Sequence, residues 1–337
     1  MGSRAVSIES LHVYPLKSGV GNRVRTARLE PEGLAGDRRM MAIDEQGKCI
    51  TARDVRALLK IACEIDDVVA VFSAPDFGSI EVVTSGLSPL ASGATVWGDK
   101  VAALDGGDEA AQWLSTILGK QCRLAVRGDE TRRPLSLGDG GVVSFADTAP
   151  LLLTNQASLD DLNHRLDRPV GMARFRPNLV VAGETAFEED SWARIRIGEV
   201  VFDVAGACDR CIMVTFDPET GEATPDREPL ATLGRFRRGE DGRMYFGQFL
   251  VPRDEGRINT DDTLEVLSHK EPIRLRAGAR PPRRPLPFRK SDASPWTVSP
   301  SPRTRHTELL RLCARIGYSP PLSPRRHGKR HEERKWT

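Results

Sequence analysis

The chain has 337 residues, a length typical of about two domains, and its 49 basic and 47 acidic residues leave a net charge of +2. Hydrophobic residues make up 39% of it, enough for packed cores, yet no run approaches the roughly 18 apolar residues of a membrane-spanning helix. Six cysteines are too few for a disulfide scaffold, and the N-terminus lacks an apolar signal-peptide region, so we expect a cytoplasmic protein without a transmembrane segment.

The sequence from residue 6 to residue 84 predicts short strands joined by turns. The expected strands are Val6–Tyr14, Val24–Leu29, Arg39–Ile43, Lys48–Thr51, Val68–Phe72 and Ser79–Thr84. Asp44–Gly47 is typical of a turn, so the strands on either side of it should form a hairpin. Strands at this spacing favour a barrel or a sandwich.

Helical spacing of apolar residues occurs in two places. In Asp108–Gly119 the apolar positions from Ala110 to Leu118 follow the i, i+3, i+4, i+7, i+8 pattern of one buried face, and Gly119 can end the helix. A second helix is expected over Leu159–Leu166, with Ser158 as its N-cap.

Strands return in the second half of the chain, after a polar Gly- and Arg-rich loop at residues 127–141. The expected strands are Asn178–Ala182, Trp192–Ile197, Val200–Val204 and Ile212–Phe216. The predicted fold class is therefore mainly β, of α+β type, with few helices.

The balanced net charge conceals an acidic body and a basic tail. Residues 270–337 hold 18 basic and 5 acidic residues, whereas residues 1–269 hold 31 and 42. The tail also contains 11 of the 23 prolines, and its one helix-like stretch is Thr307–Ile316. Such a composition does not bury enough apolar surface to offset the entropy of ordering, so we expect a disordered tail. Its charge permits weak, salt-sensitive contacts, but without a binding motif we expect no nucleic-acid partner.

Cys208-Asp209-Arg210-Cys211 is the most suggestive local motif, and it allows several interpretations. A structural zinc site needs four ligands, and no second cysteine pair or nearby histidine pair is present. A redox disulfide, a buried pair of small residues, and a single thiolate bound to a soft transition metal all remain open.

A second group of candidates consists of cations beside turns, namely Lys17, Arg38, Arg53 and Arg176. The planar guanidinium of arginine suits phosphate, although each cation taken alone is typical of a solvated surface. Asp147-Thr148 suits either a turn or a hydrogen bond to a heterocycle.

Six short motifs occur in a fixed order along the chain. They are Pro15-Leu16-Lys17-Ser18, Gly36-Asp37-Arg38, Thr51-Ala52-Arg53, Asp147-Thr148, Phe175-Arg176-Pro177-Asn178 and Cys208-x-x-Cys211. This series, spanning residues 5–268, resembles the MOSC proteins that carry an N-terminal MOSC β-barrel domain, a group that includes the mitochondrial amidoxime-reducing components and bacterial relatives. The resemblance implies an N-terminal β-barrel-like domain at residues 5–125, a MOSC domain at residues 142–268 packed with it, and the tail at residues 270–337.

The resemblance also implies a bound molybdenum cofactor, Mo-molybdopterin. Cys211 would give its thiolate to the metal and be the catalytic residue, while Cys208 would lie behind it or serve only in packing. The positions that match the cofactor-binding residues of the family are Lys17, Ser18, Arg38, Asp147, Thr148, Arg176, Asn178, Asp209, Arg210 and Cys211.

The activity implied is the reduction of small N-hydroxylated compounds by removal of oxygen at molybdenum. An alternative is a cofactor or sulfur carrier that uses Cys211 without reductase activity.

The sequence departs from the pattern of the family at two places. Phe249 lacks the hydroxyl that the aromatic residue at this position carries in some relatives. Cys313 is the one cysteine after Cys211 in the sequence, which is too few for the ferredoxin-like domain of many bacterial relatives. We therefore expect a separate redox protein as electron donor.

Overall fold

The computed structural model describes residues 6–276 apart from residues 67, 136, 138 and 139. The expected disorder of the tail beyond residue 276, including the helix-like stretch Thr307–Ile316, lies outside the described residues. All described residues belong to one compact unit.

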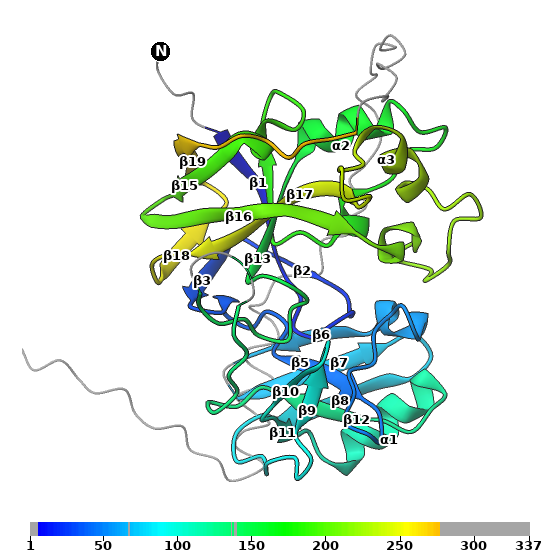
Figure 1. Ribbon diagram of the computed structural model, residues 1–337. Helices are drawn as coiled ribbons and strands as arrows, with labels where there is room; N and C mark the ends of the chain where they lie inside the picture. The colour runs from blue at the N-terminus through cyan, green and yellow to red at the C-terminus, as the bar shows by residue number, and fades with distance from the viewer. Residues whose placement is uncertain (1–5, 67, 136, 138–139, 277–337) are drawn as a thin grey trace, which may run out of the picture. The chain divides into compact units, whose positions relative to one another are not determined.

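A closed barrel of seven strands dominates the C-terminal half of the sequence. In order around the barrel, the strands are β1 (Val6–Val13), β14 (Leu179–Ala182), β13 (Leu151–Asn155), β17 (Met244–Pro252), β16 (Val200–Arg210), β15 (Trp192–Ile197) and β19 (Thr263–His269), which pairs with β1 again. β13 and β14 are parallel, and the other neighbours are antiparallel. Figure 1 shows the N-terminal strand β1, in blue, among the green and yellow strands of the barrel.

The barrel interior is filled by side chains from every part of this circuit. Leu11, Leu153, Ile195, Phe202 and Leu250 are all fully buried in it. Since β1 supplies part of this core from the opposite end of the sequence, the two halves of the chain are interlocked.

Smaller sheets make up the N-terminal half. One contains β5 (Met40–Ile43), β11 (Leu104–Asp105) and β12 (Arg123–Val126); another contains β6 (Ala62–Ile65), β7 (Val69–Ala74) and β8 (Gly78–Val83); and β9 (Ala94–Val96) with β10 (Asp99–Val101) forms a hairpin. The helix α1 (Asp108–Leu118), labelled in Figure 1, belongs to this half, and its Leu114 and Leu118 are buried in the core there.

A further sheet joins the two halves. It contains β3 (Thr26–Glu30), β4 (Gly33–Leu34) and β18 (Gly256–Asn259), and β2 (Asn22–Val24) pairs with β1. The remaining helical elements are α2 (Gln156–Asn163), α3 (Leu230–Phe236) and the 3-10 helices η1 (Arg56–Lys60), η2 (Met172–Phe175), η3 (Glu188–Ser191) and η4 (Ile212–Thr215). Within the described ranges no helix is long and apolar enough to cross a membrane.

The mainly β prediction is confirmed, and most predicted elements match. β1, β5, β7, β8, β14, β15 and α1 each lie within two residues of the expected bounds. Gly119 ends α1 in the left-handed conformation with φ 65°, as expected. The turn at residues 44–47 is also present, but no strand forms over Lys48–Thr51, because Cys49 makes an isolated bridge to Ile43 and Lys48 makes one to Thr95.

Other predictions were wrong because tertiary pairing decided the outcome. The strand expected over Val24–Leu29 is divided at Arg25, since β2 pairs with β1 whereas β3 pairs with β18. The strand expected from Val200 to Val204 continues to Arg210 because β17 pairs along its whole length.

A strand is expected over Ile212–Phe216, yet Ile212–Thr215 forms η4. The Thr215 hydroxyl donates to the carbonyl of Ile212 at 2.8 Å, which closes the helical turn. The N-cap of α2 is Asn155 rather than Ser158, because the Asn155 side chain accepts from the Ala157 amide.

Candidate functional site

All ten residues predicted for the site line one cavity of about 550 Å³. Lys17, Ser18 and Arg38 come from the loops that follow β1 and β4. Asp147, Thr148, Arg176 and Asn178 come from the segments that precede β13 and β14, and residues 209–211 lie at the end of β16. The barrel register therefore brings together motifs that lie up to 194 residues apart, from Lys17 to Cys211.

Two of the predicted cations enclose an aromatic ring. The guanidinium carbons of Arg38 and Arg176 lie 4.3 and 4.4 Å from the ring centroid of Tyr14. Arg176 Nη1 donates to the carbonyl of Gly19 at 2.7 Å, whereas its Nη2 atom is buried without a partner. Burial lowers the pKa of Arg176 to about 10, so the guanidinium stays charged at neutral pH but is poorly compensated.

The side chain of Asn178 supports these cations. Its Oδ1 atom accepts from Arg38 Nη1 at 3.0 Å and from the Leu152 amide at 3.2 Å, and its Nδ2 atom donates to His12 and Asp37, each at 3.1 Å. These four bonds use the full hydrogen-bonding capacity of an asparagine side chain. Asn178 therefore orients Arg38 at the cavity wall, and its amide has no further group free for a ligand.

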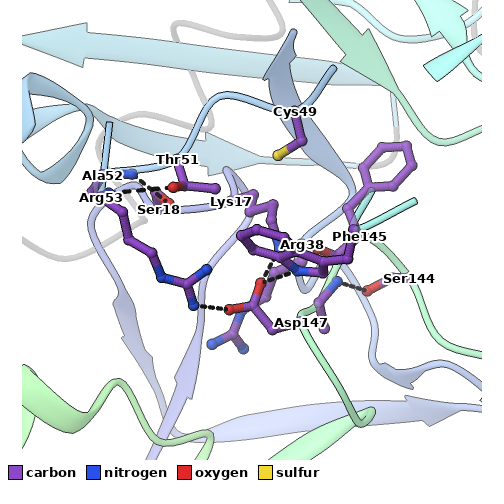
Figure 2. A network of polar contacts seen from close by, with 12 residues as sticks. Lys17, Ser18, Arg38, Cys49, Thr51, Ala52, Arg53, Ser144, Phe145 and Asp147 are labelled. Carbon is purple, nitrogen blue, oxygen red and sulfur yellow. Dashed lines mark hydrogen bonds and ion pairs between the residues drawn. The ribbon is translucent and has the colours of Figure 1, made fainter. Parts of the chain in front are cut away.

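Lys17 and Asp147 form an ion pair at the side of the cavity, shown in Figure 2. Lys17 is 4% exposed and also donates to the carbonyl of Phe145 at 2.7 Å, whereas Asp147 is 48% exposed. Burial favours the neutral acid, but the adjacent Lys17 and Arg53 outweigh it and hold the pKa of Asp147 well below its usual range. Asp147 is thus ionised at neutral pH.

Arg53 connects the thiol of the cysteine motif to this ion pair. Its Nε atom donates to Cys211 Sγ at 3.3 Å, and its Nη2 atom donates to Asp147 Oδ2 at 3.1 Å. The loop carrying Arg53 is fixed by the amide of Ala52, which donates to Ser18 Oγ at 3.1 Å (Figure 2). Arg53 is one of the candidate cations from the sequence, but it is not among the positions that match the cofactor-binding residues of the resembling family.

The two cysteines of the motif differ in their surroundings. Cys208 is buried, its Sγ atom accepts from Arg210 Nη1 at 2.9 Å, and burial raises the pKa of the Cys208 thiol despite the nearby Arg210. Both cysteines line the cavity, but Cys211, at the start of η4, is the partly exposed one. Neither cysteine forms a disulfide. Cys211 is therefore the thiol that a ligand in the cavity can reach.

Asp209 and Thr148 line the same cavity and are partly or largely exposed. The carboxylate of Asp209 lies 3.7 Å from Arg243 Nη1. Phe249 also lines the cavity, so the wall lacks a hydroxyl at this position.

Sequence reasoning missed three further side chains. Arg133 donates through Nη2 to the carbonyl of Asp147 at 3.0 Å and through Nε to Asp99 at 2.8 Å. Arg174 and Trp97 also line the cavity. No local motif marks them, because each lies in a segment whose position depends on tertiary pairing.

The cavity carries an excess of positive charge. Seven basic and three acidic residues line it. Three of the buried donors have no partner, namely Arg174 Nη1, Arg176 Nη2 and Arg210 Nε. Unpaired buried donors are costly, so they favour an anionic ligand with several acceptor oxygens. The residues present thus fit a phosphorylated cofactor.

Among residues 6–276, the gaps excepted, no group of three or more His, Cys, Asp or Glu side chains is placed to hold a metal ion. A metal in this cavity would need donors from its own cofactor in addition to Cys211. A dithiolene with a cysteine thiolate provides such a set of soft sulfur ligands.

The fold and the cavity together define a class of protein, a mainly β protein with a cavity lined by basic side chains beside an accessible thiol. Residues 5–121 match the family model described as "MOSC N-terminal beta barrel domain", and residues 140–265 match "MOSC domain". The mitochondrial amidoxime-reducing component 1 of Mus musculus is 33% identical over 282 residues, which cover 77% of this chain and 82% of the relative. The chain therefore belongs to the MOSC family.

Other relatives extend this comparison. The mitochondrial amidoxime-reducing component 1 of Homo sapiens is 31% identical, over 77% of this chain and 83% of the relative. The molybdenum cofactor sulfurase of Danio rerio is 31% identical over 79% of this chain but only 34% of its own length. Among solved structures, the YUAD protein from Bacillus subtilis covers 80% of this chain and 99% of its own at 11% identity, with a TM-score of 0.36, too low to support an argument.

Proposed function

We propose that this cavity binds the molybdenum cofactor and that the protein reduces small N-hydroxylated compounds. The observation that carries the proposal is that the accessible thiol of Cys211 opens into the same cavity as seven basic side chains. The relatives named amidoxime-reducing components support the reaction class, since an amidoxime is an N-hydroxylated amidine.

The basic residues would hold the cofactor through its phosphate. Arg174, Arg176 and Arg210 each keep a buried donor without a protein partner, and phosphate oxygens would supply the missing acceptors. Asn178 and Asp37 keep Arg38 in place, because both accept hydrogen bonds from its guanidinium. The guanidinium groups are thus charged, and Arg38 is oriented, before a ligand enters the cavity.

Cys211 would give the metal a thiolate ligand. When bound, the cofactor supplies two-electron redox chemistry together with oxygen-atom acceptance. Overall, the N–O bond breaks, two electrons and two protons are consumed, and an N–H compound and water are formed. The electrons would come from a separate redox protein. Arg53 Nε donates toward the sulfur of Cys211 and holds it at the cavity wall.

Paired cysteine variants test this proposal. Cys211→Ala should lose both bound molybdenum and turnover of an amidoxime with an artificial electron donor, whereas Cys208→Ala is the matched control and should keep both. Metal content measured by mass spectrometry and product formation are the readouts. Full molybdenum and full turnover in Cys211→Ala would refute the proposal.

A carrier of the cofactor or of sulfur is the second candidate, favoured by the match to a molybdenum cofactor sulfurase. In that case the protein would bind cofactor without reducing any N-hydroxylated compound, whichever donor is supplied. Labelled sulfur recovered on Cys211 as a persulfide, together with absent turnover, would identify the carrier.

A further inference from the structure

Trp97 occupies an unusual place at the tip of a hairpin. β9 and β10 are joined by two residues, Trp97 and Gly98, because Val96 pairs directly with Asp99. The φ angles of Trp97 and Gly98 are 51° and 99°, both in the region required by a type I′ turn. Such turns favour Asn-Gly or Asp-Gly, and a bulky residue with positive φ is a genuine outlier.

Backbone strain of this kind gathers at the cavity. Seven non-glycine residues of the described chain have positive φ. Four of them line the cavity, namely Ser18, Arg38, Trp97 and Arg176. Strained backbone persists mainly where the surrounding structure imposes it and clusters at functional sites. Trp97 shares this feature with three residues of the proposed cofactor site.

The hairpin tip is also held in place. Trp97 Nε1 donates to Asp147 Oδ1 at 3.1 Å, and Arg133 Nε donates to Asp99 at 2.8 Å on the other arm of the turn. The guanidinium carbon of Arg53 lies 4.6 Å from the centroid of the indole. The same guanidinium contacts Cys211, so one side chain links the ring to the thiol.

The indole nevertheless remains accessible. Trp97 is 50% exposed, whereas the cations Lys17 and Arg133 in the same cavity are 4% and 6% exposed. This half-exposed tryptophan on a strained turn lines the cavity and belongs to none of the hydrophobic cores of the described residues. Lys17 Nζ lies 5.5 Å from the centroid of the ring in addition to Arg53, so a flat ligand would stack on the part of the indole that stays exposed to solvent.

We propose that Trp97 is a specificity-determining residue that selects planar, conjugated N-hydroxylated substrates by stacking them at the mouth of the cavity. This inference rests on the proposed reductase function and adds the substrate class to it. Arg53 and Asp147 hold the indole in position at the cavity wall.

A substitution that the turn tolerates distinguishes the effect of the indole ring on binding from an effect on folding. Trp97→Asn provides the Asn-Gly pair that the turn favours, while it removes the stacking surface and the Nε1 donor to Asp147. Trp97→Phe keeps a ring but loses the Nε1 donor. Benzamidoxime and acetamidoxime form a matched substrate pair, since they share the amidoxime group and differ in phenyl against methyl.

In Trp97→Asn, the KM for benzamidoxime should rise about five- to tenfold relative to that for acetamidoxime, within the range of aromatic stacking energies. Trp97→Phe should retain most of the preference. Molybdenum content should equal that of the parent protein. An unchanged KM ratio would overturn the inference, and so would loss of molybdenum in Trp97→Asn, because the ring would then be holding the cofactor.

Equilibrium binding keeps this test independent of turnover. Titration calorimetry of both amidoximes with the purified protein, without electron donor, should show the same loss of preference in Trp97→Asn. If the parent protein reduces neither compound, the proposed function fails, yet calorimetry still decides the role of Trp97. If reduction proceeds but Trp97→Asn binds both compounds as the parent does, only the further inference fails.

Discussion

At the scale of single residues, Glu189 holds a buried carboxyl group outside the cavity. Its side chain is fully buried and accepts from Ser158 Oγ at 2.8 Å and from Asn155 Nδ2 at 3.3 Å. Burial raises the pKa of Glu189 to about 7, and the hydrogen bonds only partly oppose this. The folded protein therefore holds a proton that the unfolded chain releases near its ordinary pKa of about 4.3.

This proton makes stability depend on pH. A raised carboxyl pKa gives stability that is fully present below the unfolded pKa and is lost as pH rises through the folded pKa of about 7. The unfolding free energy should therefore decrease by about 2 kcal/mol from pH 5 to pH 8 because of this group. Glu189→Gln should abolish that decrease. Urea unfolding of both proteins across this range measures it, and parallel stability curves would contradict the prediction.

At the scale of elements, β17 depends on a glycine that no side chain can replace. Gly247 has a φ of 80°, and a Cβ atom there would lie 2.6 Å from the carbonyl oxygen of Leu153 in the neighbouring strand β13. Gly78, at the turn between β7 and β8, also has positive φ at 64°, but nothing lies within 4 Å of its Cβ position.

Comparing the two glycines distinguishes the cost of a left-handed backbone from the cost of a steric clash with the neighbouring strand. Gly78→Ala should cost about 1 kcal/mol for the left-handed backbone alone, whereas Gly247→Ala should cost about 3 kcal/mol because the strand backbone must also shift. Urea midpoints of the two variants measure the difference. Equal losses would show that β13 and β17 accommodate the methyl group without cost.

At the scale of the whole molecule, β1 decides whether the barrel closes. It lies between β14 and β19 and buries Ile8, Leu11 and Val13 in the barrel core. Full burial of such side chains contributes about 1.5–3 kcal/mol each, which together approaches the 5–15 kcal/mol that typically stabilises a domain. The C-terminal half should therefore not be stable by itself.

Fragments test this interlocking. A fragment of residues 140–276 should show no cooperative thermal unfolding by circular dichroism, while residues 6–276 should unfold in one transition. Adding a peptide of residues 6–14 to the short fragment should restore part of the transition. A cooperative transition in the short fragment, with a midpoint equal to that of residues 6–276, would show that β1 is dispensable.

The sequence by itself determined features that depend on short segments. The apolar face of α1, its closure at Gly119 and the strands β1, β14 and β15 follow from spacing and turn residues, because local periodicity and turn chemistry were enough. The ordered motifs likewise identified residues such as Lys17, Arg176 and Cys211, and all of them line one cavity.

Tertiary structure alone decided the rest. The position of β13 follows from its pairing with β14 and β17, and Ile212–Thr215 forms a 3-10 helix where a strand is expected. Trp97 and Arg133 carry no local signature, since hydrogen bonds to Asp147 from another part of the chain define their roles. Local patterns report which face of an element is apolar, whereas long-range pairing fixes which side chains meet around a cavity.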